Sequence, residues 1–339
     1  MAESRPTVLV TESEYRKAEA SFLSAKGLAC LRAPDDEDSL AAALRETPAT
    51  AVIVGPRPYT GPLYDALPQG GVIARFGVGH DNIDKRKATA AGLLCTNTPG
   101  VLNQSVAEHT MLLVAAAARP LLSTSANMTR HVWDPAPGVE LQGKTLAIVG
   151  CGGIGRAVAR IAALGYGMRV VGCSRPGLPP PAAVEHVDVI TNDFAIAARQ
   201  ADFVSLHMTA SRENVHFINR ERLAHLGEHT WLINTARGSI VDEVALFAAL
   251  NDRRLGGAAL DVFEREPYVP ADGGDLRSLP NVILTPHVGS NTAAANRRMA
   301  ERALQNVTFA EARAFAQMDL LNPEVLPGTP SEPEPDLLQ

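Results

Sequence analysis

Three short segments in the second half of the chain combine an arginine, acidic residues and a histidine. They are Asn234-Thr-Ala-Arg237-Gly238, Asp261-Val-Phe-Glu264-Arg-Glu266-Pro267 and Thr285-Pro286-His287-Val-Gly289. An arginine can hold a carboxylate through two parallel hydrogen bonds. A histidine can protonate a carbonyl oxygen near neutral pH, and a carboxylate beside it orients the ring and stabilises its cation. The set predicts reduction of a 2-keto acid by hydride transfer, although spacing alone leaves open that these are surface residues of three loops.

A glycine-rich segment further upstream predicts a site for a nicotinamide dinucleotide. The run Thr145-Leu-Ala-Ile-Val leads into the pattern G-x-G-x-x-G, between a predicted strand and a predicted helix. The first glycine of this pattern permits a tight turn, the second a close approach to a pyrophosphate, and the third close packing of helix and strand. The N–H groups at the helix start hold the phosphates. The residues assigned to this site are Gly150, Gly152, Gly153, Ile154 and Gly155; a plain glycine turn is the alternative.

The end of the next predicted strand bears on the choice between NAD and NADP. NAD sites usually place an acid there, about 20 residues after the glycines, to bind the ribose hydroxyls. The segment from 168 to 177 contains no acid and places Ser174 and Arg175 at this point. Because a serine and an arginine can bind a 2′-phosphate, we expect NADP to be favoured over NAD. The alternative is that Arg175 is a solvated loop residue.

The elements that carry these residues form two series of short apolar runs, separated by Ala-rich helical stretches. Strands are predicted at 7–10, 51–54, 72–75 and 93–96, and then at 145–150, 169–173, 203–207, 231–234, 258–262 and 282–285. Nearly all of these runs are apolar throughout, as in parallel α/β sheets covered on both faces. An apolar helix predicted over 104–118 takes the chain to the second series, and an Ala/Arg-rich helix predicted over 292–316 returns it to the first.

The fold class is therefore predicted as α/β, with two doubly wound parallel-sheet domains. The first domain is expected to comprise residues 1–100 and 292–321, and the second residues 101–291. The segment 322–339 is rich in Pro and Glu and is predicted to be a disordered tail.

The overall composition excludes several classes of protein. The chain has 339 residues, which suits two domains, and a net charge of −6 without a long basic run, so neither nucleic acid nor a membrane is an expected partner. Its longest apolar run, Met111–Ala118, is too short to span a bilayer. The four cysteines form no C-x-x-C pair and no cluster has zinc spacing, which predicts reduced thiols and no metal. The N-terminus lacks the apolar segment of a signal peptide, so we expect a cytoplasmic protein.

In combination, these motifs resemble the D-isomer-specific 2-hydroxyacid dehydrogenase family, which includes glyoxylate/hydroxypyruvate reductases and phosphoglycerate dehydrogenases. The resemblance covers residues 51–306. It also rests on the segments Gly77-Val-Gly79-His-Asp81-Asn-Ile-Asp84, Asn97-Thr-Pro-Gly100, Ser105-Val-Ala-Glu108-His109 and Gly143-Lys144-Thr145. It implies a Rossmann NAD(P)-binding domain, a flavodoxin-like discontinuous catalytic domain and a homodimer. The implied activity is hydride transfer between NAD(P)H and a small 2-keto acid such as glyoxylate or hydroxypyruvate.

The resemblance also implies roles for the residues of the three segments. Arg237 matches the arginine that binds the substrate carboxylate and carbonyl. His287 matches the acid/base residue. Glu266, and not Glu264, matches the carboxylate that pairs with this histidine.

Further matches concern the substrate and the cofactor. Val78 and Gly79 are expected to offer backbone N–H groups to the substrate carboxylate, and Arg57 is assigned to a loop that faces the substrate. The remaining expected cofactor contacts are Val106, His207, Thr235, Ala236, Asp261 and Gly289.

Three related functions on this fold are alternatives. Formate dehydrogenases, as the resemblance implies, carry Gln at the position of Glu266, and phosphite dehydrogenases carry Lys at the position of Val78, so both residues argue against those activities. Some transcriptional corepressors use the fold as an NAD(H)-sensing scaffold and keep the catalytic trio. Fold and trio together therefore do not exclude a binding protein. The lack of long extensions other than a short Pro/Glu tail weakens this alternative.

Overall fold

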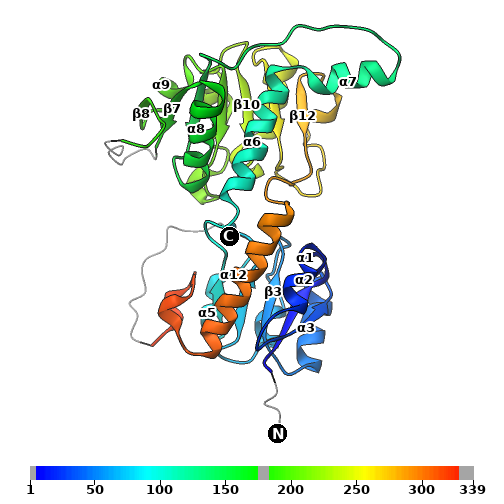
Figure 1. The fold of residues 1–339 in the computed structure, drawn as a ribbon, viewed down its shortest axis with the longest axis vertical. Coiled ribbons are helices and arrows are strands. Elements are labelled where there is room, and N and C mark those ends of the chain that lie inside the picture. The colour runs from blue at the N-terminus through cyan, green and yellow to red at the C-terminus, as the bar shows by residue number, and fades with distance from the viewer. Residues whose placement is uncertain (1–4, 175–182, 328–339) are drawn as a thin grey trace. The chain divides into compact units, whose positions relative to one another are not determined.

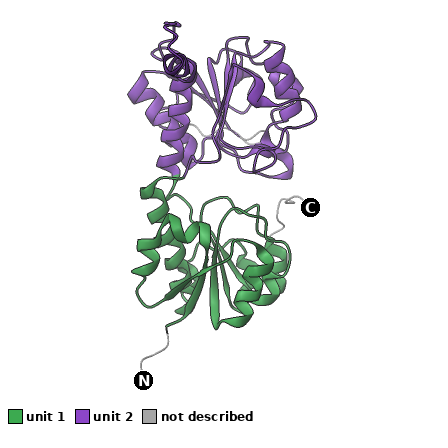
Figure 2. Cartoon of the chain, turned by 90° about the vertical axis from the view of Figure 1, so that its right-hand side faces the viewer, with its two compact units in different colours: residues 1–102, 291–337 green, residues 103–290, 338–339 purple. Residues whose placement is uncertain are grey.

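A computed structural model describes residues 5–174 and 183–327, which form two compact units (Figure 2). Unit 1 comprises residues 1–102 and 291–337, and unit 2 residues 103–290, over the parts of these ranges that the structure describes. The chain therefore leaves unit 1 after its fifth strand and re-enters it through its last long helix. The boundaries between the units fall after residues 102 and 290. The sequence analysis placed them after residues 100 and 291.

Unit 1 contains a five-stranded parallel sheet with the order β2-β1-β3-β4-β5, which is the order of flavodoxin-like folds. Its strands are β1 (Thr7–Thr11), β2 (Ala29–Ala33), β3 (Ala49–Val54), β4 (Val72–Arg75) and β5 (Leu94–Thr96). Its helices are α1 (Glu12–Lys17), α2 (Glu19–Leu23), α3 (Glu37–Glu46), α4 (Leu63–Ala66), α5 (Lys85–Ala90) and α12 (Ala293–Glu311), with the 3-10 turns η4 (Phe315–Gln317) and η5 (Pro323–Val325). Helix α12 ends five residues before the end that the sequence predicts.

Unit 2 contains a seven-stranded parallel sheet with the order β12-β11-β10-β9-β6-β7-β8. The strand order reverses beside β6, as in Rossmann folds. Its strands are β6 (Thr145–Val149), β7 (Arg169–Cys173), β8 (Val189–Thr191), β9 (Phe203–Leu206), β10 (Trp231–Asn234), β11 (Gly257–Leu260) and β12 (Val282–Leu284). Its helices are α6 (Asn103–Ala118), α7 (Leu121–Thr129), α8 (Gly153–Tyr166), α9 (Phe194–Ala198), α10 (Arg220–Leu223) and α11 (Glu243–Asn251), with the 3-10 turns η1 (Arg212–Asn214), η2 (Gly238–Ile240) and η3 (Leu276–Ser278).

Helices cover both faces of the unit 2 sheet, which explains why its central strands are mostly apolar. On one face α6 and α8 lie side by side (Figure 1), and Met111 and Val158 pack against Ile148 of β6. On the other face Leu246 of α11 shares a core with Leu232 of β10. Helix α7 differs from its neighbours because it has no buried residue and projects away from the sheet in both views. None of the helices in the described ranges has the length and hydropathy needed to cross a bilayer.

Two strands, β2 and β8, are absent from the sequence-based prediction. Each lies at an edge of its sheet and pairs with a single neighbour. Leu31 and Arg32 of β2 and Val189 of β8 are exposed. Neither segment therefore has the wholly apolar run of a strand that is covered on both faces.

The prediction of a disordered tail from residue 322 is wrong at its start. Asn322 is fully buried. Its side chain donates to the carbonyl of Leu93 at 2.9 Å and accepts from the N–H of Cys95 at 2.8 Å, and η5 follows it. Composition missed this because one buried asparagine anchors an otherwise polar segment. Residues 328–339 of the predicted tail lie outside the described residues.

Candidate active site

Four strands of unit 2 end in the loops that carry the predicted site residues. Strand β6 leads into the glycine-rich loop, and the neighbouring strands β10, β11 and β12 lead into the loops of Arg237, Glu266 and His287. Because all of these strands are parallel, their carboxyl ends lie at one edge of the sheet. That edge is where open α/β sheets bind their ligands.

His287 and Glu266 form a close pair. Nδ1 of His287 lies 2.6 Å from Oε2 of Glu266, and each side chain is 34% exposed. The other oxygen of Glu266 accepts a hydrogen bond from the N–H of Phe263 at 3.1 Å, which fixes the carboxylate on its own loop. With Nδ1 donating to the carboxylate, Nε2 is the atom left to exchange a proton.

Asp261 holds the bend in which His287 lies. His287 has a φ of 52°, and its N–H donates to the carbonyl of Asp261 at 2.8 Å. The Asp261 carboxylate accepts from the hydroxyl of Thr285 at 2.6 Å. It also accepts from the N–H groups of Val288 and Gly289 at 2.9 and 2.8 Å. Both oxygens of one carboxylate thus fix the loop that carries the histidine.

Helix α6 supports this arrangement through two neighbouring residues. Nε2 of His109 lies 3.4 Å from Oδ1 of Asp261 and 3.2 Å from the hydroxyl of Thr285. Burial raises the pKa of the Asp261 carboxyl, but hydrogen bonds from His109, Thr285 and the loop N–H groups outweigh it, and the pKa lies below its ordinary value. The hydroxyls of Thr110 and Thr235 are 2.8 Å apart, which joins α6 to the end of β10.

Arg237 lies in a tightly packed turn after β10. The side chain of Asn234 donates to the carbonyl of Arg237 at 2.9 Å and accepts from the N–H of Ala236 at 3.1 Å. Nη1 of Arg237 donates to the Ala236 carbonyl at 2.8 Å. A Cβ on Gly238 would lie 1.8 Å from the carbonyl carbon of Phe263. The arginine loop therefore contacts the backbone of the loop that carries the carboxylate.

The glycine-rich loop has the geometry of a phosphate cradle. Gly150 has a φ of 102°, and a Cβ there would lie 2.5 Å from the carbonyl oxygen of His207. A Cβ on Gly155 would lie 2.1 Å from the Gly150 oxygen, so only glycine allows α8 to start so close to β6. Beside Gly152 there is open space, and the first turn of α8 has no side-chain cap. The residues present therefore fit a bound pyrophosphate.

Ser174 directly follows β7 and is half-buried. Its N–H and its hydroxyl both donate to the carbonyl of Thr191, at 2.8 and 3.3 Å. The longer of these contacts is the weaker one, so the hydroxyl can turn toward another acceptor. Arg175, the other residue expected to contact a 2′-phosphate, lies outside the described residues.

His207 is an uncharged packing residue at neutral pH. Nε2 of its ring lies 2.8 Å from the hydroxyl of Ser205, and burial lowers its pKa to about 3. Its carbonyl lies against Gly150, at the base of the phosphate cradle. Contact of its side chain with a cofactor stays a prediction.

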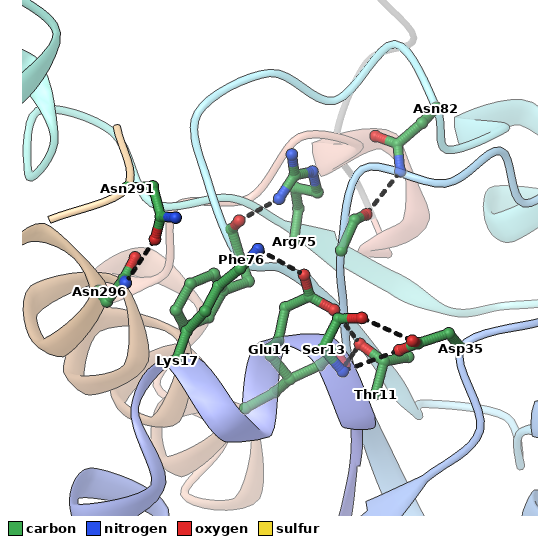
Figure 3. A network of polar contacts seen from close by, with 12 residues as sticks. Thr11, Ser13, Glu14, Lys17, Asp35, Arg75, Phe76, Asn82, Asn291 and Asn296 are labelled. Carbon is green, nitrogen blue, oxygen red and sulfur yellow. Dashed lines mark hydrogen bonds and ion pairs between the residues drawn. The ribbon is translucent and has the colours of Figure 1, made fainter. Parts of the chain in front are cut away.

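The residues assigned to the substrate in unit 1 follow β3 and β4. Val78 and Gly79 belong to the loop after β4, and Arg57 to the loop after β3. The side chain of Asn82 donates to the carbonyls of Gly55 and Arg57 at 2.9 and 2.8 Å, a contact region drawn in Figure 3. The asparagine therefore holds the two loops together.

A buried carboxylate at the same edge of unit 1 is absent from the sequence-based prediction. Glu14 of α1 is 2% exposed; it accepts from the hydroxyl of Thr11 and lies 3.2 Å from Nζ of Lys17 (Figure 3). A Cβ on Gly55 would lie 2.4 Å from its Oε1. The glycine after β3 thus leaves space for a buried charge.

Comparison with known proteins identifies the family of this chain. The family model described as D-isomer specific 2-hydroxyacid dehydrogenase, NAD binding domain, matches residues 111–289. The chain belongs to this family. The dehydrogenase is 38% identical over 277 residues to a glyoxylate reductase of Thermococcus litoralis. The matched residues cover 79% of this chain and 82% of the relative. The dehydrogenase is 39% identical over 230 residues to a hydroxypyruvate reductase of Thermotoga maritima, which covers 67% and 73%.

A solved structure agrees with this assignment. It is the NADPH-dependent glyoxylate/hydroxypyruvate reductase of Sinorhizobium meliloti in complex with NADP and malonate, with a TM-score of 0.74 and 30% identity over 90% of this chain and 93% of the other. The predicted family and fold class are confirmed, and the dehydrogenase is a nicotinamide-dependent oxidoreductase that acts on a CH–OH group.

Two parts of the dehydrogenase site were not expected from the sequence. The contact of His109 with Asp261 joins residues far apart in the chain, and the only signal for it was the place of His109 in a family motif. Glu264, which the resemblance excludes as the partner of His287, contacts His216 instead, with Oε1 and Nε2 3.2 Å apart.

Proposed function

We propose that this dehydrogenase reduces small 2-keto acids such as glyoxylate or hydroxypyruvate to 2-hydroxy acids, of the D configuration where a stereocentre forms, with NADPH as the preferred hydride donor. The observation that carries the proposal is the 2.6 Å contact between His287 and Glu266. The loop of Glu266 follows β11, the strand next to β10, which leads into the loop of Arg237. The names of relatives at 38% and 39% identity support this substrate class. Nothing in the comparisons favours the alternative of an NAD(H)-sensing binding protein.

Each residue of the trio has one task in this proposal. The guanidinium of Arg237 binds the substrate carboxylate and polarises the keto group. Nε2 of His287 donates its proton to the keto oxygen, and Glu266 stabilises the imidazolium before the transfer. A bound reduced nicotinamide supplies the hydride. On resemblance alone, Val78, Gly79 and Arg57 of unit 1 are assigned to substrate binding.

The cofactor is assigned to the carboxyl edge of the unit 2 sheet. The open space at Gly152 and the uncapped start of α8 support a pyrophosphate at the glycine-rich loop. Ser174 and Arg175 are assigned to the 2′-phosphate of NADP. The residues assigned to the rest of the cofactor are Val106, His207, Thr235, Ala236, Asp261 and Gly289.

A panel of 2-keto acids tests this function. Each acid is assayed with NADPH and with NADH by the absorbance of the reduced nicotinamide, for the wild type and for Arg237→Gln and Arg237→Lys. Glyoxylate and hydroxypyruvate should be reduced by the wild type, and both variants should lose most of kcat/KM because an ammonium does not replace the guanidinium fork. Failure of every keto acid to oxidise a cofactor that does bind would overturn the proposal.

We also propose a homodimer that forms through unit 2. The α7 segment, defined as residues 121–133, has exposed apolar side chains at Leu121, Leu122, Met128 and Trp133, the last of them 82% exposed. Exposed apolar patches of this kind mark interaction sites. Most soluble oligomers are symmetric assemblies of one chain, so a second copy of this chain is the proposed occupant.

A cytoplasmic location without a nucleic-acid partner is part of the same proposal. All four cysteines are free thiols, and two of them, Cys95 and Cys173, are buried. Free thiols persist in reducing compartments, whereas oxidising ones favour disulfides. The net charge of −6 gives no attraction to phosphate backbones.

A further inference from the structure

Two residues before Glu266, Glu264 forms a reciprocal contact with Glu243, the first residue of α11. The N–H of Glu264 donates to Oε1 of Glu243 at 2.7 Å, and the N–H of Glu243 donates to Oε1 of Glu264 at 3.0 Å. Glu243 is buried, whereas a third of the Glu264 side chain is exposed. The two hydrogen bonds attach the loop after β11 to the N-terminus of α11, an end of a helix that favours negative charge.

A third segment meets Glu264 through His216. Nε2 of His216 lies 3.2 Å from Oε1 of Glu264, the oxygen that also accepts from Glu243. The N–H of His216 donates to the carbonyl of Ser239 at 2.8 Å, in the turn that follows Arg237. One carboxylate oxygen therefore contacts both α11 and the segment next to the arginine loop.

The backbone just before Glu264 is closely constrained on its other side. Phe263, which precedes Glu264, donates its N–H to Oε1 of Glu266 at 3.1 Å. The backbone of Phe263 also lies against Gly238, where a Cβ would approach its carbonyl carbon to 1.8 Å. A displacement of Glu264 therefore moves Phe263, and with it the carboxylate of Glu266 and the contact to the arginine loop.

Several charged and titratable groups face this loop. They are Glu243 of α11, His216 of the segment after η1 and His287 of the loop after β12, together with Glu264, Arg265 and Glu266 of the loop itself. Burial raises the pKa of Glu243; the N–H of Glu264 opposes this, and the charges of Glu264 and Glu266 add to it. Removal of Glu264 therefore changes both the geometry and the electrostatic potential around Glu266.

We infer that Glu264 is a positioning residue of the proton transfer. Its hydrogen bonds with Glu243 and its contact with His216 hold Glu266 at the distance at which it pairs with His287. The inference rests on the proposed function, since it assigns a task to a neighbour of the proposed acid/base pair. Glu264 itself does not contact the reacting atoms in this assignment.

The pH profile of keto-acid reduction separates positioning from a merely structural role. The variants are Glu264→Ala, which removes both contacts, and Glu264→Gln, which keeps an oxygen that can accept from Glu243 and His216. Glu264→Ala should lower kcat by about 10-fold, because small displacements of catalytic groups are costly, and should move the falling limb of the profile to lower pH. Glu264→Gln should keep kcat within about 2-fold and leave the limb close to that of the wild type.

Two control variants complete the design. Glu221→Ala, at an exposed position of α10, should leave the profile unchanged. Glu264→Asp, which keeps the charge but shortens the side chain, replaces Glu264→Ala if that variant does not fold, and the limb should again move to lower pH.

Three outcomes would overturn the inference. The first is a falling limb of the pH profile that stays at the wild-type pH in Glu264→Ala or Glu264→Asp, once the rates are corrected for the fraction of folded enzyme. The second is an equal limb shift in Glu264→Gln and Glu264→Ala, which would assign the effect to charge rather than to position. The third is a loss of thermal stability alone. A wild-type profile in Glu266→Gln and His287→Asn would instead overturn the proposed function, so the two failures are distinguishable.

Discussion

The hydroxyl of Thr285 lies 2.6 Å from Oδ1 of Asp261 and joins the end of β12 to the end of β11. Asp261 is 1% exposed, so its charge depends on the donors that the chain supplies. Two of these donors are N–H groups in the loop that carries His287. The stability of unit 2 and the placement of the proposed proton donor therefore depend on the same carboxylate.

Replacement of this carboxylate should give a pH-dependent loss of stability. At pH 7, Asp261→Asn should lower the free energy of unfolding by about 1.5–3 kcal/mol, the range for hydrogen bonds to a charged group. The pKa of Asp261 is lowered in the folded chain. Its contribution is thus fully present above the unfolded value of about 3.9 and is lost as the pH falls through the lower folded value.

Urea unfolding at a series of pH values measures this effect. The difference in the free energy of unfolding between wild type and Asp261→Asn should be constant above about pH 4 and should become smaller below it. Asp252→Asn, at an exposed position, is the control and should have little effect. A difference that persists unchanged on acidification would contradict the prediction.

Removal of the charge of Glu266 should shift the pH dependence of catalysis. Reduction needs a proton from His287, and the Glu266 carboxylate stabilises the imidazolium that gives it, so Glu266→Gln should move the falling limb of the pH profile of reduction to lower pH. Oxidation of the hydroxy acid should show the opposite trend and improve as the pH rises. In His287→Asn, kcat should fall by about 10²-fold or more, with cofactor affinity largely kept. An unmoved limb in Glu266→Gln would exclude it as the partner.

The preference for NADPH should depend on the residues after β7. A charge-assisted contact to the 2′-phosphate contributes about 1.5–3 kcal/mol, which corresponds to about a 10- to 150-fold preference in kcat/KM. The double variant Ser174→Asp with Arg175→Ala should shift the preference toward NADH, because an acid binds the ribose hydroxyl and repels the phosphate. The specificity constants for both cofactors measure this. A wild type that prefers NADH would show that Arg175 has another role.

The proposed homodimer should depend on the α7 segment. Light scattering at micromolar concentration should give about twice the chain mass of 35.9 kDa. The double variant Leu122→Glu with Trp133→Ser should give a mass near that of one chain, because a charge replaces apolar surface at the contact. Ile196→Glu changes an exposed apolar residue of α9 and should leave the dimer intact. A wild-type mass near one chain would contradict the prediction.

Strands could be predicted from the sequence where residues are covered on both faces, whereas their order in each sheet comes from the structure. The apolar runs at β6 and β10 identify such strands, and the parallel α/β class follows from them. The edge strands β2 and β8 could not be found in this way, because each contains exposed residues and lacks a fully covered apolar run. The packing of Asn322 depends on partners more than 200 residues away in sequence, which local composition does not reveal.

The candidate site shows the same division between local pattern and long-range contact. The types Arg, Glu and His predict the chemistry, but spacing alone does not distinguish Glu264 from Glu266 as the partner of the histidine. Resemblance favoured Glu266, and the structure brings Glu266 to 2.6 Å from His287. The tasks of Glu264 and His109 depend on contacts between separate loops and helices, for which one sequence offers no periodicity or spacing.

The position of β12 at the edge of the unit 2 sheet has a consequence for local unfolding. Within the described residues β12 pairs only with β11, whereas β6 lies between β7 and β9. Opening of an edge element costs less free energy than global unfolding. The segment before His287 should therefore open before the glycine-rich loop after β6 does under mild denaturation. The enzyme would then lose turnover before it loses the capacity to hold a dinucleotide.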